Sequence, residues 1–172
     1  MANKDAAKGF WPVKSLVGGE IRSREYVVKV SQTIRVGDAV KLVSAQISVA
    51  SIASATTDLV GVAAHAVTTD ASSVGSLKVY DDPEQLFGIQ TITGTSATAS
   101  MVGQTAKINA GAGSSVYSKS THELDIASLS TTTAFMVMGI IETPSNNWSS
   151  SGHTDVLVRF NQHRFKAPYA AT

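Results

Sequence analysis

Short segments rich in β-branched residues recur along most of the chain, separated by clusters of Gly, Asp, Asn, Pro or Ser. Val, Ile and Thr lose rotamer freedom in helices but pack well on a pleated sheet. Segments spaced roughly 8–18 residues apart are typical of a β-sandwich or β-barrel and not of alternating strands and helices. The pattern predicts strands near residues 26–30, 34–43, 46–52, 59–67, 76–80, 86–92, 106–109, 116–118, 124–127, 135–141 and 155–160.

Helical signals are few. Residues 97–102 could form one turn, which Gly103 would end, so we expect one or two short helical turns at most. Residues 36–42 and 102–108 share Val-Gly followed by Lys and an aliphatic residue at equal spacing. Two such units could close one barrel, although chance similarity explains the pattern equally well.

The length of 172 residues fits one compact domain with a tail left over. Residues 1–25 have neither helical nor strand periodicity, and we expect an extended N-terminal arm that reaches a neighbouring subunit; a disordered tail is the alternative. Residues 26–160 would form the body and residues 161–172 a C-terminal tail. The predicted fold is therefore all-β: a compact β-barrel or β-sandwich with an extended N-terminal arm and a short C-terminal tail.

Charge is balanced overall, at a net +1, but it is unevenly distributed. Residues 1–30 hold six basic against three acidic side chains and residues 153–172 three against one, which leaves an acidic body. This balance argues against an ordinary nucleic-acid-binding protein. Basic ends fit docking on acidic protein surfaces, with ordinary solvated charge as the alternative. The longest apolar run, residues 134–141, is far shorter than the roughly 20 residues of a membrane helix, and we expect neither a membrane span nor a signal peptide.

Residues that carry chemistry are sparse. There is no Cys, and His65, His122, His153 and His163 are scattered without metal-binding or catalytic spacing. No Ser lies in a nucleophile-elbow motif. We therefore expect no catalytic residue, no cofactor and no metal ion, and an interior or interface position for His65. Residues 81–84 read as a turn fixed by its proline, with a Ca²⁺ site as the weaker alternative.

Several segments taken in order resemble the decoration, or cement, proteins of tailed-bacteriophage capsids. The segments are residues 1–6, 9–13, 18–22, 36–42, 61–63, 79–83, 87–90, 138–141 and 156–163. The resemblance implies an all-β, non-enzymatic protein on the outer surface of an icosahedral head. It would form a homotrimer at three-fold and quasi-three-fold positions, made in the host cytoplasm and bound to the major capsid protein, with no nucleic-acid or membrane partner. The Ser/Thr-rich residues 44–57 and 91–100 depart from the family's pattern.

Aromatic and basic residues near the two ends are the candidates for docking, because these residue types dominate protein interfaces. The candidates are Lys4, Lys8, Phe10, Trp11, Arg22, Arg24, Arg164 and Phe165. A different class of function is a carbohydrate- or receptor-binding module of a virion fibre or tail, in which Trp148 would stack on a sugar; covering a barrel end is the other interpretation of this tryptophan. A hydrolase with a dispersed site is a third alternative, and it requires a pocket in which Ser or His meets a carboxylate.

Overall fold

The computed structural model describes residues 3, 5–51, 58–111, 119–130, 132–148 and 153–166. Their regular secondary structure is almost entirely strand, which confirms the all-β prediction. Their only helical element is the short 3₁₀ turn η1 (Ala99–Met101), inside the segment expected to form one turn. None of their helical residues makes a segment long and apolar enough to cross a membrane. The strand expected at residues 116–118 lies outside the described part of the chain.

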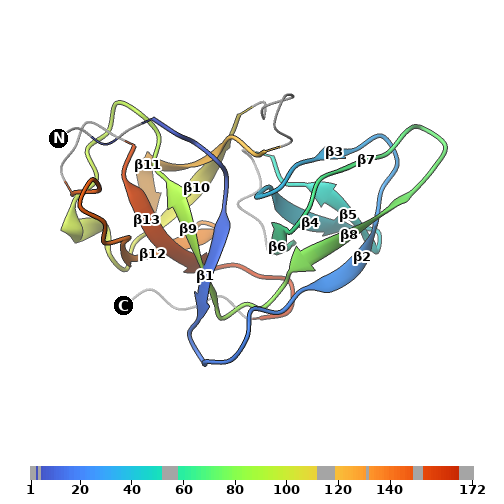
Figure 1. Ribbon diagram of the computed structural model, residues 1–172, viewed down its shortest axis with the longest axis horizontal. Helices are drawn as coiled ribbons and strands as arrows, with labels where there is room; N and C mark the ends of the chain where they lie inside the picture. Colours follow the sequence, from blue (N-terminus) through green and yellow to red (C-terminus); the bar gives the residue numbers. More distant parts are fainter. Residues whose placement is uncertain are drawn as a thin grey trace.

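One half of the molecule is a small closed barrel, on the right in Figure 1. Its strands, in spatial order, are β2 (Arg24–Val28), β5 (Gln46–Val49), β4 (Ala39–Val43), β6 (Leu59–Ala63) and β8 (Gly75–Tyr80). The short strands β3 (Thr33–Ile34) and β7 (Val67–Thr68) pair beside it. Aliphatic side chains fill the interior because they alternate along the strands with residues that face outwards.

The other half is a six-stranded sheet, here called the large sheet. Its strands, in spatial order, are β1 (Trp11–Ser15), β9 (Gln85–Gln90), β13 (Asp155–Phe160), β12 (Phe135–Ile140), β10 (Thr105–Ala110) and β11 (His122–Ser130). The sheet curls until the chain after β9 meets β11, where Thr91 and Leu124 form a parallel bridge. Phe87, Phe135 and Phe160 lie fully buried in its core.

The two halves share a pattern of strand pairing. In the closed barrel, β2 contacts β5 in parallel, and Lys29 donates its backbone N–H to Ile47 over 2.9 Å. In the large sheet, Ile92 donates in the same way to Leu124 of β11 over 3.0 Å. All other neighbouring strands in these two series pair antiparallel. The series are β5–β4–β6–β8–β2 in the closed barrel and β11–β10–β12–β13–β9 in the large sheet.

The turns that precede β4 and β10 match as well. Gly37, with φ 85°, donates its N–H to Ala63 over 3.0 Å, and Gly103, with φ 87°, donates to Val137 over 2.9 Å. The positive φ explains the shared glycine, because other residues rarely adopt it. The two similar sequence segments thus start equivalent strands in separate halves and do not close one barrel.

Strand β6 joins the halves because both of its faces are buried. Val60 and Ala63 point into the closed barrel, whereas Leu59 and Val62 belong to the core of the large sheet. This two-sided burial accounts for the unbroken apolar sequence of β6. Gly61 allows β8 to approach closely, since a Cβ atom at this position would lie 2.1 Å from the carbonyl oxygen of Tyr80.

Strand β1 corrects the expectation that all of residues 1–25 form a free arm. Trp11 pairs with Gly88 and Pro12 with Phe87, and the register shifts between Pro12 and Lys14. The sequence pattern missed this strand because Pro12 lacks an N–H and Trp-Pro-Val-Lys-Ser has no clean alternation. Among the described residues of the expected arm, 16–23 contain no strand.

We predict that Gly61→Ala destabilises the protein by about 1–3 kcal/mol, because the added methyl group must push β6 away from the β8 backbone. Chemical denaturation followed by circular dichroism measures the change. Gly139→Ala is the matched control, since Gly139 is also a strand glycine and a Cβ atom there meets nothing within 4 Å. Equal stability losses in the two variants would contradict the close approach.

Candidate docking surface

Phe10 is not available for docking. Its side chain is 2% exposed and lies in the core of its own chain, with ring centroids 4.6 Å from Phe135 and 6.3 Å from Phe87. Its N–H donates to Gly37 over 2.9 Å, which fixes the residues before β1 against the closed barrel. The expectation that Phe10 fills a pocket of another protein is therefore wrong, because burial of this large apolar ring is already satisfied within the chain.

Lys8 and Trp11 lie together on the large sheet. The Lys8 Nζ atom sits 3.9 Å from the centroid of the Trp11 ring, a cation–π contact. The indole covers Gly88, where a Cβ atom would lie 2.2 Å from the ring. These two candidates thus contact each other and the chain's own sheet. Lys4 lies outside the described residues.

Arg22, Arg24 and Phe165 come together around one hollow. The wall also includes Val17 and Pro83, so the hollow joins the segment between β1 and β2, the turn between β8 and β9, and the C-terminal segment. We call the surface formed by Val17, Arg22, Arg24, Pro83 and Phe165 the arm–tail face. Val17 is not among the predicted docking residues, because nothing local in a sequence distinguishes an exposed valine from a buried one.

The acidic turn at residues 81–84 lines the same hollow and is built as predicted. Asp82 accepts the N–H of Glu84 on its side-chain oxygen over 2.8 Å and the N–H of Gln85 on its carbonyl over 3.0 Å. Asp81 accepts the Tyr26 hydroxyl over 2.6 Å, and its carboxylate lies 3.3 Å from the Arg24 Nε atom. Burial, with the nearby Asp81 carboxylate, raises the pKa of Tyr26 to about 12, because both disfavour the charged phenolate.

The C-terminal segment is fastened to β6 and holds Phe165 outwards. His163 accepts the N–H of Phe165 on Nδ1 over 3.2 Å, which leaves Nε2 to donate to the Val60 carbonyl over 2.7 Å. Arg164 donates its N–H to Leu59 over 2.7 Å, and its guanidinium pairs with Asp58 at 3.1 Å. Lys166 forms an ion pair with Glu84. No local sequence pattern indicates this anchoring role of His163, because its partner Val60 lies about a hundred residues earlier in the chain.

The arm–tail face exposes apolar side chains. Val17 is 75% exposed and Phe165 is 54% exposed. Val13, Leu16 and Ile21, on the same N-terminal segment, are also exposed. Apolar groups next to Arg22 and Arg24 form the kind of surface that binds another protein, because aromatic residues and Arg supply much of the energy of protein interfaces.

One buried His–carboxylate pair meets part of the hydrolase expectation. His122 Nε2 lies 3.5 Å from Asp38 Oδ1, and Nδ1 accepts the Ala39 N–H over 3.3 Å. Asp38 also accepts the Arg35 N–H over 2.7 Å. The imidazole is only 4% exposed and both nitrogens face partners inside the fold, so this pair has no access to a substrate. It links the closed barrel to β11. His65, expected in an interior or interface, is exposed on this chain.

Trp148 lies partly buried against the core of the large sheet, which agrees with its interpretation as a cover on one end of the fold. Its ring lines a shallow hollow with Ile140, Pro144 and Asn147. Part of the ring is therefore available to a ligand.

Comparisons with protein-family models, with curated proteins and with solved structures find no match to this chain.

We predict that stability falls as the pH drops below about 6.5. Burial lowers the pKa of His122, against the opposing Asp38 charge, and burial also lowers the pKa of His163. As the pH falls, the unfolded chain therefore takes up protons on these histidines before the folded chain does. Below the unfolded pKa of about 6.5, the free energy of unfolding decreases by up to about 1.4 kcal/mol per pH unit for each histidine.

Urea unfolding at pH 8 to 5 measures this dependence. The slope should decrease in His122→Gln and in His163→Gln, whatever their stability at pH 8, and stay unchanged in His65→Gln. An unaltered slope in both core variants would refute the assignment.

Proposed function

We propose that this protein is a non-enzymatic decoration protein of a tailed-bacteriophage head. In this role it binds the outer capsid surface as a homotrimer at three-fold and quasi-three-fold positions and stabilises contacts between major capsid subunits. The ordered sequence resemblance motivates the proposal, and the all-β fold agrees with it. The observation that carries it is the arm–tail face, where exposed apolar side chains lie beside two arginines.

The arm–tail face suits attachment to a large neighbour. Val17 and Phe165 are anchors that would lose water-exposed apolar area on docking. Arg22 makes no ion pair among the described residues, whereas Arg24 forms one with Asp81. Glu20, Asp81 and Asp82 line the same hollow as the two arginines, so its charge is mixed, and Arg22 is the basic group that can pair with a carboxylate of the partner.

Trimer formation would multiply a weak contact. Three linked copies bind with an effective concentration that a single copy lacks, so modest affinity at each arm–tail face suffices for stable attachment. Closed cyclic symmetry lets one kind of contact serve all three copies.

The attachment surface proposed here is narrower than a whole N-terminal arm. Phe10 and β1 belong to the fold, so removal of residues 1–25 would delete part of the core together with any docking segment. Point substitutions on the exposed residues separate docking from folding.

A carbohydrate-binding module is the alternative, and the accessible part of Trp148 favours it. Binding to a glycan array that is lost in Trp148→Ala would support this alternative. The copy number per particle separates the classes, because decoration requires hundreds of copies and a fibre or tail component far fewer.

We predict that Val17→Asp and Phe165→Ser each weaken binding to purified heads by on the order of tenfold, because each removes an apolar side chain from the docking surface. Both side chains are exposed, so the substitutions should change the stability of the unbound protein little. Arg22→Glu should also weaken binding, and the loss should be larger at low salt than at high salt because salt screens charge interactions. Sedimentation of heads with titrated protein, followed by mass measurement of the particles, gives the occupancy.

Val74→Asp is the matched control, since Val74 is a 55% exposed valine in the β7–β8 connection. Full occupancy by the Val17→Asp/Phe165→Ser double variant would remove the arm–tail face from the mechanism. Failure of the unmodified protein to bind heads, or its absence from mature particles, would overturn the proposed function.

A further inference from the structure

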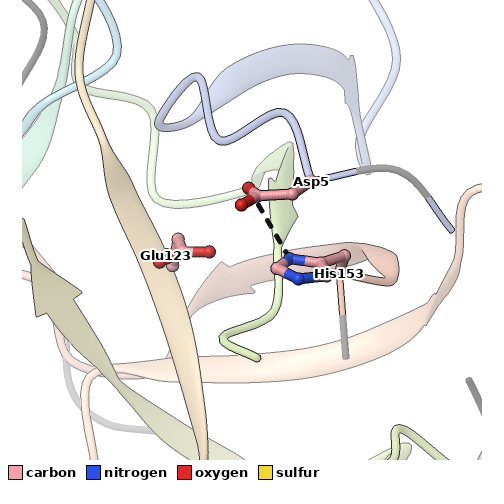
Figure 2. Close-up of side chains that lie close together, drawn as sticks. All are labelled: Asp5, Glu123 and His153. Carbon is pink, nitrogen blue, oxygen red and sulfur yellow. Dashed lines mark ion pairs between the residues drawn. The ribbon is translucent and has the colours of Figure 1, made fainter. Parts of the chain in front are cut away.

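Asp5, Glu123 and His153 meet on the large sheet, although they are far apart in the sequence. Asp5 precedes β1, Glu123 lies in β11 and His153 lies shortly before β13. One ligand atom from each lies within 4.8 Å of the other two. Figure 2 shows the three side chains turned towards a common space, with the Asp5 carboxylate above the imidazole.

The imidazole of His153 has an unused nitrogen at this point. Nδ1 is buried and has no hydrogen-bond partner among the described residues; it lies 3.7 Å from Asp5 Oδ1, beyond hydrogen-bond distance. The residue is held through its backbone, since its N–H donates to Thr91 over 3.2 Å and its carbonyl accepts Gln90 Nε2 over 3.3 Å. The ring thus points into the cluster, where it pairs with the Asp5 carboxylate (Figure 2).

Charge at the cluster also calls for a cation. Carboxylate oxygens of Asp5 and Glu123 lie within 4.8 Å of each other. Two carboxylates this close repel each other when both are ionised. A divalent cation would remove that repulsion and use the free nitrogen as well.

We propose that Asp5, Glu123 and His153 form a divalent metal site that prefers Zn²⁺. Zn²⁺ binds both imidazole nitrogen and carboxylate oxygen, and water can complete a tetrahedral shell around three such protein ligands. Ca²⁺ instead takes six to eight oxygen ligands and Mg²⁺ retains most of its water, so both fit a nitrogen-containing triad less well. This departs from the expectation of no metal, which rested on sequence spacing.

The role of the ion is structural. Ala6 already donates its N–H to Gln90 Oε1 over 2.9 Å, and Asn3 Nδ2 donates to Thr154 Oγ1 over 3.0 Å. These contacts hold the first residues against β9 and the start of β13, and a metal bound to Asp5 fastens them to β11 as well. The site lies apart from the arm–tail face in sequence and does not depend on the proposed function.

Isothermal titration of the full chain with ZnCl₂, after EDTA treatment and dialysis, tests the site. We expect one equivalent to bind, and Asp5→Asn, Glu123→Gln and His153→Asn each to weaken binding at least tenfold. Asn is chosen at position 153 because φ there is 60°, a conformation that Asn tolerates. Asp5 is 73% exposed, so Asp5→Asn tests binding without disturbing the core.

His65→Asn is the matched control, because it removes an exposed imidazole elsewhere. It should bind Zn²⁺ like the unmodified chain. Saturating ZnCl₂ should also raise the midpoint of thermal unfolding in the unmodified chain and in His65→Asn, but not in His153→Asn. CoCl₂ should give visible absorption bands of a four-coordinate site that disappear in His153→Asn.

Absence of stoichiometric Zn²⁺ binding would overturn the proposal and leave a His–carboxylate ion pair. Unchanged binding in both Asp5→Asn and His153→Asn would overturn it too, because the ion would then lie elsewhere. Tighter binding of CaCl₂ than of ZnCl₂ would refute the nitrogen-containing coordination.

Discussion

The two-sided burial of β6 is the constraint on which the rest of the structure depends. Leu59 and Val62 of this strand complete the core of the large sheet, and Val60 and Ala63 complete that of the closed barrel, so neither half can bury its apolar interior without β6. Gly61 makes the arrangement possible because the backbone of β8 occupies the place of a side chain. The C-terminal segment then returns to the same strand, where His163 and Arg164 bond to Val60 and Leu59. The two halves consequently form one cooperative unit.

Sequence reasoning predicted the strands whose pattern is local. In β8 and β13, buried residues alternate with more exposed ones, and turn residues mark where each strand ends. It failed at β1, where Pro12 interrupts the pattern and where burial of Phe10 is decided by distant Phe87 and Phe135. Exposure of a lone apolar residue near a terminus cannot be inferred from the residue itself.

In the candidate sites too, residue types could be predicted from local sequence, but their arrangement in space could not. Aromatic and basic residue types identified Arg22, Arg24 and Phe165 as surface candidates, but their convergence with Val17 depends on how the chain ends cross the β8–β9 turn. The Asp5–Glu123–His153 cluster is harder still, because its members come from three segments and no spacing rule connects them. Local patterns therefore predict elements, whereas sites that combine several segments require the tertiary structure.

The irregular outer strand β1 has a further consequence for how copies of this chain can associate. A sheet border with free N–H and C=O groups can recruit a strand from another molecule and start open-ended polymerisation. Pro12 offers no N–H on that border, and the shifted register after it bends the ladder out of alignment. A strand of another molecule therefore meets an irregular border on this side, which disfavours open-ended strand pairing.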